Sequence, residues 1–165
     1  MTALDDLNAA SHDAAVARLA PCVAIDRWAH DLAAGRPYAD VAAVVAASQA
    51  HAATWTPAEV ESALAGHPRI GERATGPGAH ATMSSREQAG VDHADTDVVA
   101  RLRDGNRRYE ERFDRIYLVR AAGRSAEEML GLLEERLTHD PATEIEVTRG
   151  QLAEITALRV QDLVS

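Results

Sequence analysis

The side chains best suited to proton transfer in this chain are His67 and Glu87, which stand twenty positions apart. A histidine titrates near neutral pH and can therefore take up or release a proton during catalysis. His67 lies between Gly66 and Pro68, and a proline restricts the residue before it to extended conformations, which fixes the backbone that carries the imidazole. The alternative is a loop histidine without a chemical role.

Glu87 has two interpretations as well. It stands at the third position after Ser84, the spacing of a capping box, where it would only bond the backbone at the start of a helix. A helix N-terminus also presents N–H groups without partners and the positive end of the helix dipole. The segment around Glu87 is therefore also a candidate cradle for a substrate oxygen, formed by Ser84, Ser85, Arg86 and Gln88.

Two arginines are candidates for binding carboxylate or carbonyl oxygens, because the guanidinium group is a planar fork of donors. Arg120 follows the apolar run 116–119 and precedes the small residues Ala121-Ala122-Gly123, where backbone can approach a ligand closely. Arg159 stands among apolar residues near the end of the chain. For either arginine the alternative is an ion pair on the surface with one of the 26 acidic residues.

Metal and phosphate chemistry is poorly supported. His67, His80 and His93 with Glu87 include the right ligand types, but the sequence has no His-x-x-x-His pair, no HExxH motif and no cysteine pair. The glycines at 76 and 78 lack the Lys-Ser/Thr of a phosphate-binding loop. All 17 basic residues are arginine, so lysine Schiff-base chemistry is excluded. We expect no metal.

Length and composition limit the class of protein to which these residues belong. At 165 residues the chain is expected to form a single domain over 1–165. Its net charge of −9 argues against nucleic-acid binding, and no apolar run is long enough for a transmembrane helix. The lone cysteine, Cys22, suggests a reducing compartment and a buried thiol, and the start of the sequence carries no visible signal peptide, so a cytoplasmic location is expected.

The elements that must position the site are expected to be helices. The sequence has 34 alanines, the best helix former, and only 4% aromatic residues. Capping residues, apolar periodicity and Gly/Pro breaks predict an all-α, single-domain bundle of about seven to nine helices with one irregular active-site loop over 66–83. The expected helices cover residues 3–10, from 11 onward, 25–34, 38–54, 57–65, from 84 onward, 96–112, 126–137, and a last long helix after Pro141. In the helix over 38–54, Val41, Val44 and Val45 are expected to face inward, and the run 116–119 is β-prone and expected to pack, extended, against helices.

Taken together, several motifs resemble the OHCU (2-oxo-4-hydroxy-4-carboxy-5-ureidoimidazoline) decarboxylase family of uric acid degradation, over about residues 7–164. They are His67-Pro68-Arg69-Ile70-Gly71 with Ser84-Ser85-Arg86-Glu87-Gln88-Ala89-Gly90; Asn106, Tyr109 and Phe113 with residues 116–125; Arg136-Leu137-Thr138-His139-Asp140; and Glu154-Ile155 with Leu158-Arg159. The combination of the first two motifs is specific, whereas neither would be alone. The chain departs from the pattern at His139-Asp140-Pro141, where an Asn-Asp pair is common, and the position of Arg120 varies in the family.

The resemblance implies an all-α lyase that converts OHCU to (S)-allantoin and carbon dioxide without a cofactor. It makes His67 and Glu87 the catalytic residues. The substrate contacts that it implies fall on Pro68, Ser84, Ser85, Arg86, Gln88, Leu118, Val119, Arg120, Ala121, Ala122 and Arg159. The partner is then the small-molecule substrate, with no nucleic acid and no membrane. The family is often dimeric, and Trp28, Trp55 and the alanine-rich helices are candidates for an apolar patch, so a homodimer is one possibility and the sequence leaves the oligomeric state open.

Two alternatives belong to other classes. One is a helical binding module without catalysis, which would have no need for a histidine fixed before a proline. The other is a relative of the same fold that acts on another purine catabolite, such as the preceding hydroxyisourate, and the His67–Glu87 pair does not distinguish it.

Overall fold

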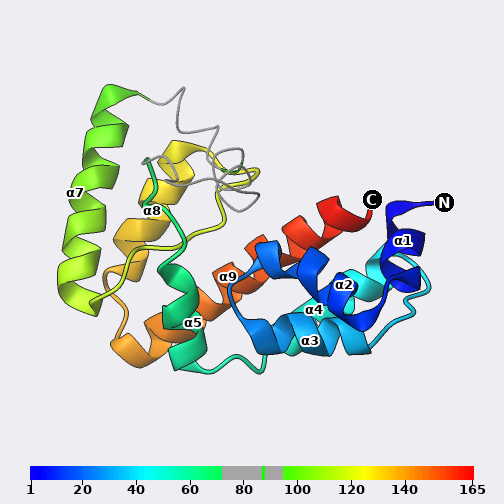
Figure 1. The fold of residues 1–165 in the computed structure, drawn as a ribbon. Coiled ribbons are helices and arrows are strands. Elements are labelled where there is room, and N and C mark those ends of the chain that lie inside the picture. The colour runs from blue at the N-terminus through cyan, green and yellow to red at the C-terminus, as the bar shows by residue number, and fades with distance from the viewer. Residues whose placement is uncertain (72–86, 88–94) are drawn as a thin grey trace. The chain divides into compact units, whose positions relative to one another are not determined.

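Helices dominate the described part of the chain (Figure 1). The computed structural model describes residues 1–71, 87 and 95–165. Within this part there are eight α-helices and one 3₁₀ turn, and no residue lies in a strand, which confirms the all-α prediction. The elements are α1 (Ala3–Ala9), α2 (His12–Leu19), η1 (Ala20–Cys22), α3 (Asp26–Ala34), α4 (Val41–Ala52), α5 (Pro57–Leu64), α7 (Thr96–Phe113), α8 (Ala126–Arg136) and α9 (Pro141–Val164).

The helix starts follow the capping residues. The side chains of Ser11, Thr56 and Ser125 each accept a backbone N–H from the first turn of the helix that follows. The start predicted for α4 was wrong by three residues. Asp40 accepts the N–H of Ala43 at 2.8 Å, so the helix begins at Val41 rather than at Tyr38. Of the three valines expected to face inward there, Val44 is buried, while Val41 and Val45 are half-buried.

The chain divides into two compact units, and each is described by itself. Unit 1 consists of Met1–Ala63 and Ala153–Ser165, and unit 2 of Leu64–Leu152. The long helix α9 contributes residues to both. A single domain over 1–165 stays a prediction.

Unit 1 is built around α2, α3 and α4, with two buried tryptophans in its core. The indole N–H of Trp28 donates to the carbonyl of Ser48 at 3.3 Å. Trp28 and Trp55 are 0% and 1% exposed, so the expectation that they supply an apolar surface patch was wrong. Burial of such large aromatic side chains removes much apolar area from water and so stabilises the core of unit 1.

Arg36 ties the first helix of unit 1 to the third. Its guanidinium donates to the carbonyls of Leu7 at 2.6 Å and Ala10 at 2.7 Å, at the end of α1. Its Nε donates to the carbonyl of Ala33 in α3 at 2.7 Å. These carbonyls lie at helix ends, where backbone acceptors lack partners within the helix. The side chain of Arg36 therefore supplies hydrogen-bond donors to the ends of both α1 and α3.

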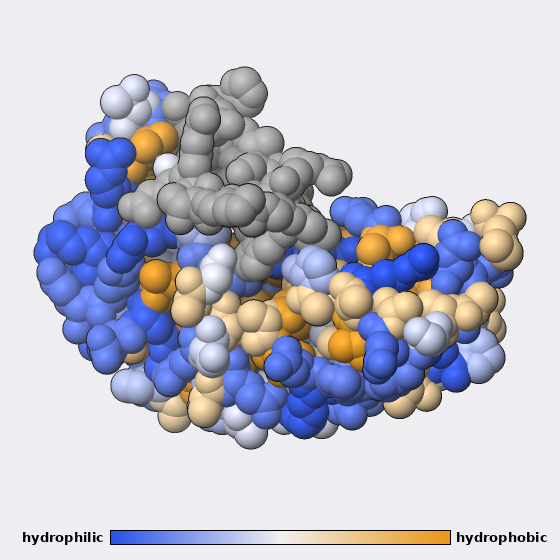
Figure 2. All heavy atoms as spheres, in the orientation of Figure 1, coloured by the Kyte–Doolittle hydropathy of each residue, from blue (hydrophilic) through white to orange (hydrophobic). Residues whose placement is uncertain are grey.

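Unit 2 is organised by α7 and α8, which pack side by side (Figure 1). They approach closely at Gly105, where an added Cβ would stand 2.4 Å from a methyl carbon of Leu133. The outward side of α7 is hydrophilic, as Figure 2 shows, and its arginines are exposed. The buried cluster of this unit consists of Ile70, Leu102, Tyr109, Phe113, Tyr117, Val119, Ala121, Ala126, Met129, Leu130 and Leu133.

The apolar run after α7 packs without forming a strand. Tyr117, Leu118 and Val119 are buried, and the hydroxyl of Tyr117 donates to the carbonyl of Met129 in α8 at 2.9 Å. The run is neither helix nor strand, which agrees with the expectation of a segment packed against helices. Across the described ranges, no helix is both long and apolar enough to cross a membrane.

Candidate active site

The loop that carries His67 begins where α5 ends. The backbone N–H of His67 donates to the carbonyl of Leu64 at 3.0 Å and so closes a turn beyond the last helical residue. His67 and Pro68 are half-buried. The described part of the predicted irregular loop, residues 66–71, is not helical, and residues 72–83 lie outside the described ranges.

Helix α7 anchors this loop three residues beyond His67. The side-chain amide of Asn106, which is 5% exposed, donates to the carbonyl of Ile70 at 3.0 Å. Arg69 forms an ion pair with Glu110, in which Nη2 lies 3.1 Å from Oε2. Gly71 follows with φ of +88°, a conformation that favours glycine. The histidine loop is therefore held by buried and charged contacts to one rigid helix.

A hollow of about 250 Å³ lies where this loop meets α7. It is lined by Arg69, Ile70, Gly71, Val99, Arg103, Asn106, Arg107 and Glu110. None of the site residues predicted from the sequence is among these lining residues, and two of its arginines are paired with acidic side chains of α7. The hollow is thus distinct from the residues that the sequence indicates.

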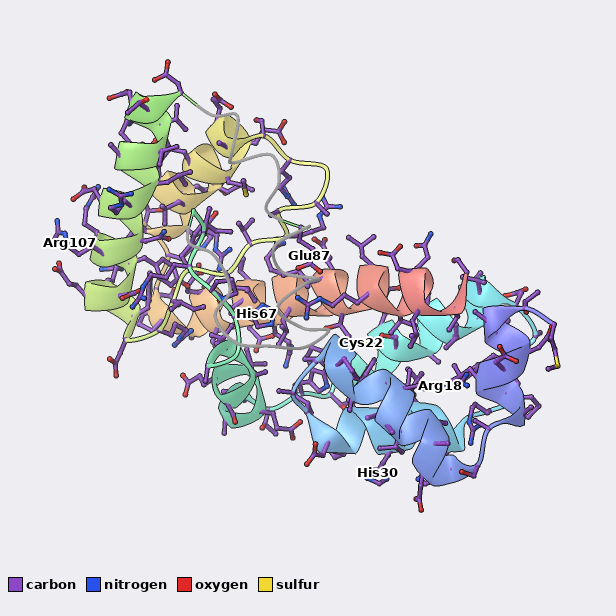
Figure 3. All side chains as sticks on the ribbon, turned by 45° about the horizontal axis from the view of Figure 1, so that its top comes forward. Arg18, Cys22, His30, His67, Glu87 and Arg107 are labelled. Carbon is purple, nitrogen blue, oxygen red and sulfur yellow. The ribbon has the colours of Figure 1, made fainter. Side chains whose placement is uncertain are left out.

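Glu87, the predicted partner of His67, is helical and half-buried. Both residues belong to unit 2. Their positions are labelled in Figure 3. Ser84, Ser85, Arg86 and Gln88 lie outside the described residues, so the capping and cradle interpretations of this segment stay predictions.

The predicted backbone-binding segment, residues 118–122, is held from one side by two side chains. The carbonyl of Leu118 accepts a hydrogen bond from Nη1 of Arg136 at 2.5 Å. The N–H of Arg120 donates to Oε1 of Gln151 at 2.9 Å. A turn follows, in which the N–H of Arg124 donates to the carbonyl of Ala121 at 3.1 Å. Leu118, Val119 and Ala121 are buried, while Arg120 and Ala122 are half-buried.

Arg136 belongs to a buried polar network centred on the carboxylate of Glu144, which is 0% exposed. Oε1 of Glu144 accepts from Nε of Arg136 at 2.7 Å and from the hydroxyl of Tyr109 at 2.5 Å. Oε2 lies 3.1 Å from Nδ1 of His139. Burial, and secondly the hydrogen bond to Glu144, raise the pKa of Tyr109 to about 12. The guanidinium of Arg136 and the carboxylate of Glu144 can both be buried because they form an ion pair with each other.

Arg159 belongs to unit 1. It is 2% exposed, and its Nη1 donates to the carbonyl of Cys22 at 3.1 Å. The alternative of an ion pair on the surface was therefore wrong for this residue, because the side chain is buried. Cys22 is buried too, as predicted.

The ligand set considered for a metal is only partly described, since His80 and His93 lie outside the described residues. Among the residues that are described, no group of three or more His, Cys, Asp or Glu side chains is arranged to hold a metal ion.

Asn106 and Arg136 belong to the family motifs but were not predicted as site residues, and Glu144 and Gln151 were not singled out in the sequence. A signal was present for Glu144, because residues 144, 148, 152, 155 and 159 repeat at the spacing of one helix face. All five are buried, although three of them are polar or charged. Charged residues on the apolar stripe of a helix indicate buried partners elsewhere in the fold.

Comparison with known proteins identifies the family. The family model for OHCU decarboxylase matches residues 8–161. A curated relative from Amia calva, 2-oxo-4-hydroxy-4-carboxy-5-ureidoimidazoline decarboxylase, is 31% identical over 146 residues, which are 87% of this chain and 81% of that relative.

Two solved structures share the fold. One is a crystal structure of OHCU decarboxylase in the presence of (S)-allantoin, with a TM-score of 0.73, 21% identity and coverage of 94% of this chain and 99% of that one. The other is a crystal structure of (S)-allantoin synthase, with a TM-score of 0.72, 14% identity and coverage of 98% of this chain and 53% of that one. The fold and the family match therefore agree, and the chain belongs to the OHCU decarboxylase family of carboxy-lyases.

Proposed function

We propose that this chain decarboxylates OHCU to (S)-allantoin and carbon dioxide, without a cofactor, in urate degradation. The observation that carries the proposal is the family match over residues 8–161, which includes the histidine loop and Glu87. The anchoring of that loop to α7 through Asn106 supports it, because a catalytic histidine must be held in a defined geometry.

The substrate supplies its own electron sink. OHCU carries a carboxylate on a carbon that also bears a hydroxyl and adjoins a C=N bond. When the bond to the carboxylate breaks, its electron pair forms a C=C bond, and the π pair of the imine moves onto the nitrogen, which takes up a proton. Carbon dioxide leaves and an enol remains. The enol then loses its hydroxyl proton and takes a proton on the carbon that bears the ureido group, which gives allantoin. The protein needs only to orient the carboxylate out of the ring plane, polarise the ring and move protons.

The two catalytic residues divide this work. His67 transfers the proton at the substrate hydroxyl or its enol. Glu87 accepts hydrogen bonds from N–H or O–H groups of the substrate, orients it and relays the proton. Delivery of the proton to one face of the ring gives the (S) product.

The remaining contacts position the substrate. Arg159 binds a carbonyl or carboxylate oxygen, and the peptide groups of residues 118–122 contact the ring. Pro68 and the segment of Ser84, Ser85, Arg86 and Gln88 complete the site. A single domain, a homodimer and a cytoplasmic location stay predictions.

The test is turnover of freshly generated OHCU. Urate oxidase and hydroxyisourate hydrolase produce OHCU from urate, and circular dichroism follows the allantoin formed with and without this protein. Rapid formation of optically active (S)-allantoin supports the proposal. Racemic allantoin at the uncatalysed rate would favour a binding module. If this protein removes hydroxyisourate when the hydrolase is omitted, the relative with another purine substrate is the better assignment.

The proton-transfer role has its own test. We expect His67→Asn to lower the rate at least about 10²-fold, the usual contribution of a general acid–base group. His51→Asn, the same change on α4 in unit 1, is the matched control and keeps the rate of the unchanged protein. Near-normal turnover of His67→Asn would rule out His67 as the proton carrier.

A further inference from the structure

We propose that Arg136 and Gln151 are positioning residues for the reaction. They hold the segment of residues 118–122 in the conformation that presents its peptide groups to the substrate. The inference rests on the proposed function, in which that segment contacts the ring.

The two hydrogen bonds define which side of the segment faces the protein. In an extended run, the peptide groups of residues i and i+2 point to the same side and those of residue i+1 to the opposite side. Arg136 binds the carbonyl of Leu118, and Gln151 binds the N–H two residues later. Both bonds therefore fix one edge of the segment toward α8 and α9.

On the opposite edge, three peptide N–H or carbonyl groups have no hydrogen-bond partner among the described residues. Val119 and Ala121 are 3% and 8% exposed. Nothing within the described part of the chain forms a hydrogen bond with the N–H or carbonyl of Val119 or with the N–H of Ala121. Buried peptide groups nearly always have a partner, and a bound substrate with carbonyl and N–H groups would supply one.

Arg136 is itself held rigidly. Its Nε and Nη2 both bind Oε1 of Glu144, at 2.7 and 2.5 Å, and leave Nη1 directed at Leu118. Its guanidinium also lies over the ring of Tyr117, 4.8 Å from the centroid. A planar fork can make these contacts in three directions at once, whereas a lysine ammonium is a single point charge on a flexible stem. The ion pair with Glu144 therefore holds the guanidinium of Arg136 in place, and Arg136 in turn holds residues 118–122 through the carbonyl of Leu118.

A purely structural role for this network would give a different pattern. Tyr109→Phe removes a buried hydrogen bond to Glu144 but leaves the contact between Arg136 and Leu118 in place. It is therefore the matched control for Arg136→Lys, which keeps the charge beside Glu144 and loses the bond to Leu118. Gln151→Leu is a second, independent variant, because Gln151 is half-buried and takes no part in the ion pair.

The first measurement is hydrogen–deuterium exchange over residues 116–123 in the full chain. In Arg136→Lys no backbone amide loses its own acceptor, so faster exchange there reports a looser segment. We expect exchange to be about tenfold faster in Arg136→Lys, the effect of one lost hydrogen bond of the stronger kind, and unchanged in Tyr109→Phe. Equal exchange in the two variants would overturn the proposal.

The second measurement separates kcat from KM with freshly generated OHCU. We expect Arg136→Lys to lower kcat about 10- to 100-fold, and Gln151→Leu about tenfold, because a misplacement of the order of 1 Å at a site costs about 10²-fold in rate. Tyr109→Phe keeps kcat within about twofold although it is less stable. If kcat instead follows the urea midpoints of the three variants, the role is structural and the proposal fails.

The two measurements keep this inference apart from the proposed function. An unchanged protein that does not accelerate allantoin formation overturns the proposed function and, with it, the catalytic meaning of the segment. An active unchanged protein with Arg136→Lys and Gln151→Leu at control levels overturns only the positioning role.

Discussion

Tyr109 offers a sharp test of the buried network, because the sign of its effect on stability reverses with pH. Its hydroxyl is buried and donates to Glu144 at 2.5 Å. At neutral pH, Tyr109→Phe loses one hydrogen bond to a charged group, which costs about 2 kcal/mol of unfolding free energy. Glu144 keeps its bonds to Arg136, so the variant still folds.

Alkaline pH removes the extra stability that Tyr109 gives the protein relative to phenylalanine. The pKa of Tyr109 is raised from 10.0 to about 12 in the folded protein. Between these values the unfolded chain has lost the proton and the folded chain has kept it, so stability falls as pH rises. The slope is about 1.36 kcal/mol per pH unit, and an advantage of about 2 kcal/mol is lost about 1.5 units above pH 10. The stability curves of the two proteins should therefore cross near pH 11.5.

The assay is urea unfolding, followed by circular dichroism at 222 nm, of both proteins from pH 8 to pH 12. Other groups, including Tyr38 and Tyr117, titrate in both proteins and cancel in the difference. Absorbance of tyrosinate at 295 nm should show one fewer group ionising near pH 12 in the variant. A difference in unfolding free energy that stays constant from pH 8 to pH 12 would refute the reasoning, because it would mean that Tyr109 ionises equally in both states.

Three further predictions concern packing and buried charge. Gly105→Ala should lower the free energy of unfolding, measured with urea, by about 1–3 kcal/mol, because its new methyl group meets Leu133 in the α7–α8 contact. Gly131→Ala on α8 has open space at its Cβ and should raise the free energy of unfolding by about 0.5–1 kcal/mol. Equal effects of the two substitutions would contradict the close approach at Gly105. Glu144→Ala should lower the unfolding free energy by about 3–5 kcal/mol, because it leaves a buried guanidinium unpaired, and a loss below about 1 kcal/mol would show that this charge reaches water. Arg36→Met should speed hydrogen exchange over α1 while α8 is unaffected, because the carbonyls at the end of α1 lose their donor; unchanged exchange over α1 would mean that another contact holds it.

The helices could be predicted because their signals are local. Ser11, Thr56 and Ser125 stand where a capping side chain reaches a backbone N–H three residues later, and the structure has those bonds. The start of α4 was missed although Asp40 is such a residue, because the alanine-rich pattern extends before it and periodicity alone does not mark an end.

The buried polar residues could not be predicted in the same way. Glu144 is paired with Arg136, eight positions away, and with Tyr109, 35 positions away. Whether a charged side chain on a helix is exposed or buried depends on which partners the fold brings to it. The periodicity of the helix does not show which residues those partners are. The same holds for the anchors of the 118–122 segment, which come from residues 18 and 31 positions away.

For the candidate site, motif spacing singled out His67 and Glu87, and the structure assigns both to unit 2. Their roles stay predictions. The hydrogen bonds from Asn106 to Ile70 and from Arg136 to Leu118 could not be predicted from the sequence, because each joins a side chain to a carbonyl far away along the chain.

Both tryptophans, Trp28 and Trp55, and the buried thiol of Cys22 belong to unit 1, whereas unit 2 contains Tyr109 and Tyr117 and no tryptophan. The chain therefore carries separate reporters for its two halves. Indole emission and thiol reactivity follow the opening of unit 1. In a Tyr38→Phe background, which removes the one tyrosine of unit 1, tyrosinate absorbance at high pH follows the opening of unit 2. Transitions that coincide for both reporters would show that the halves unfold as one cooperative body, joined through the continuous helix α9.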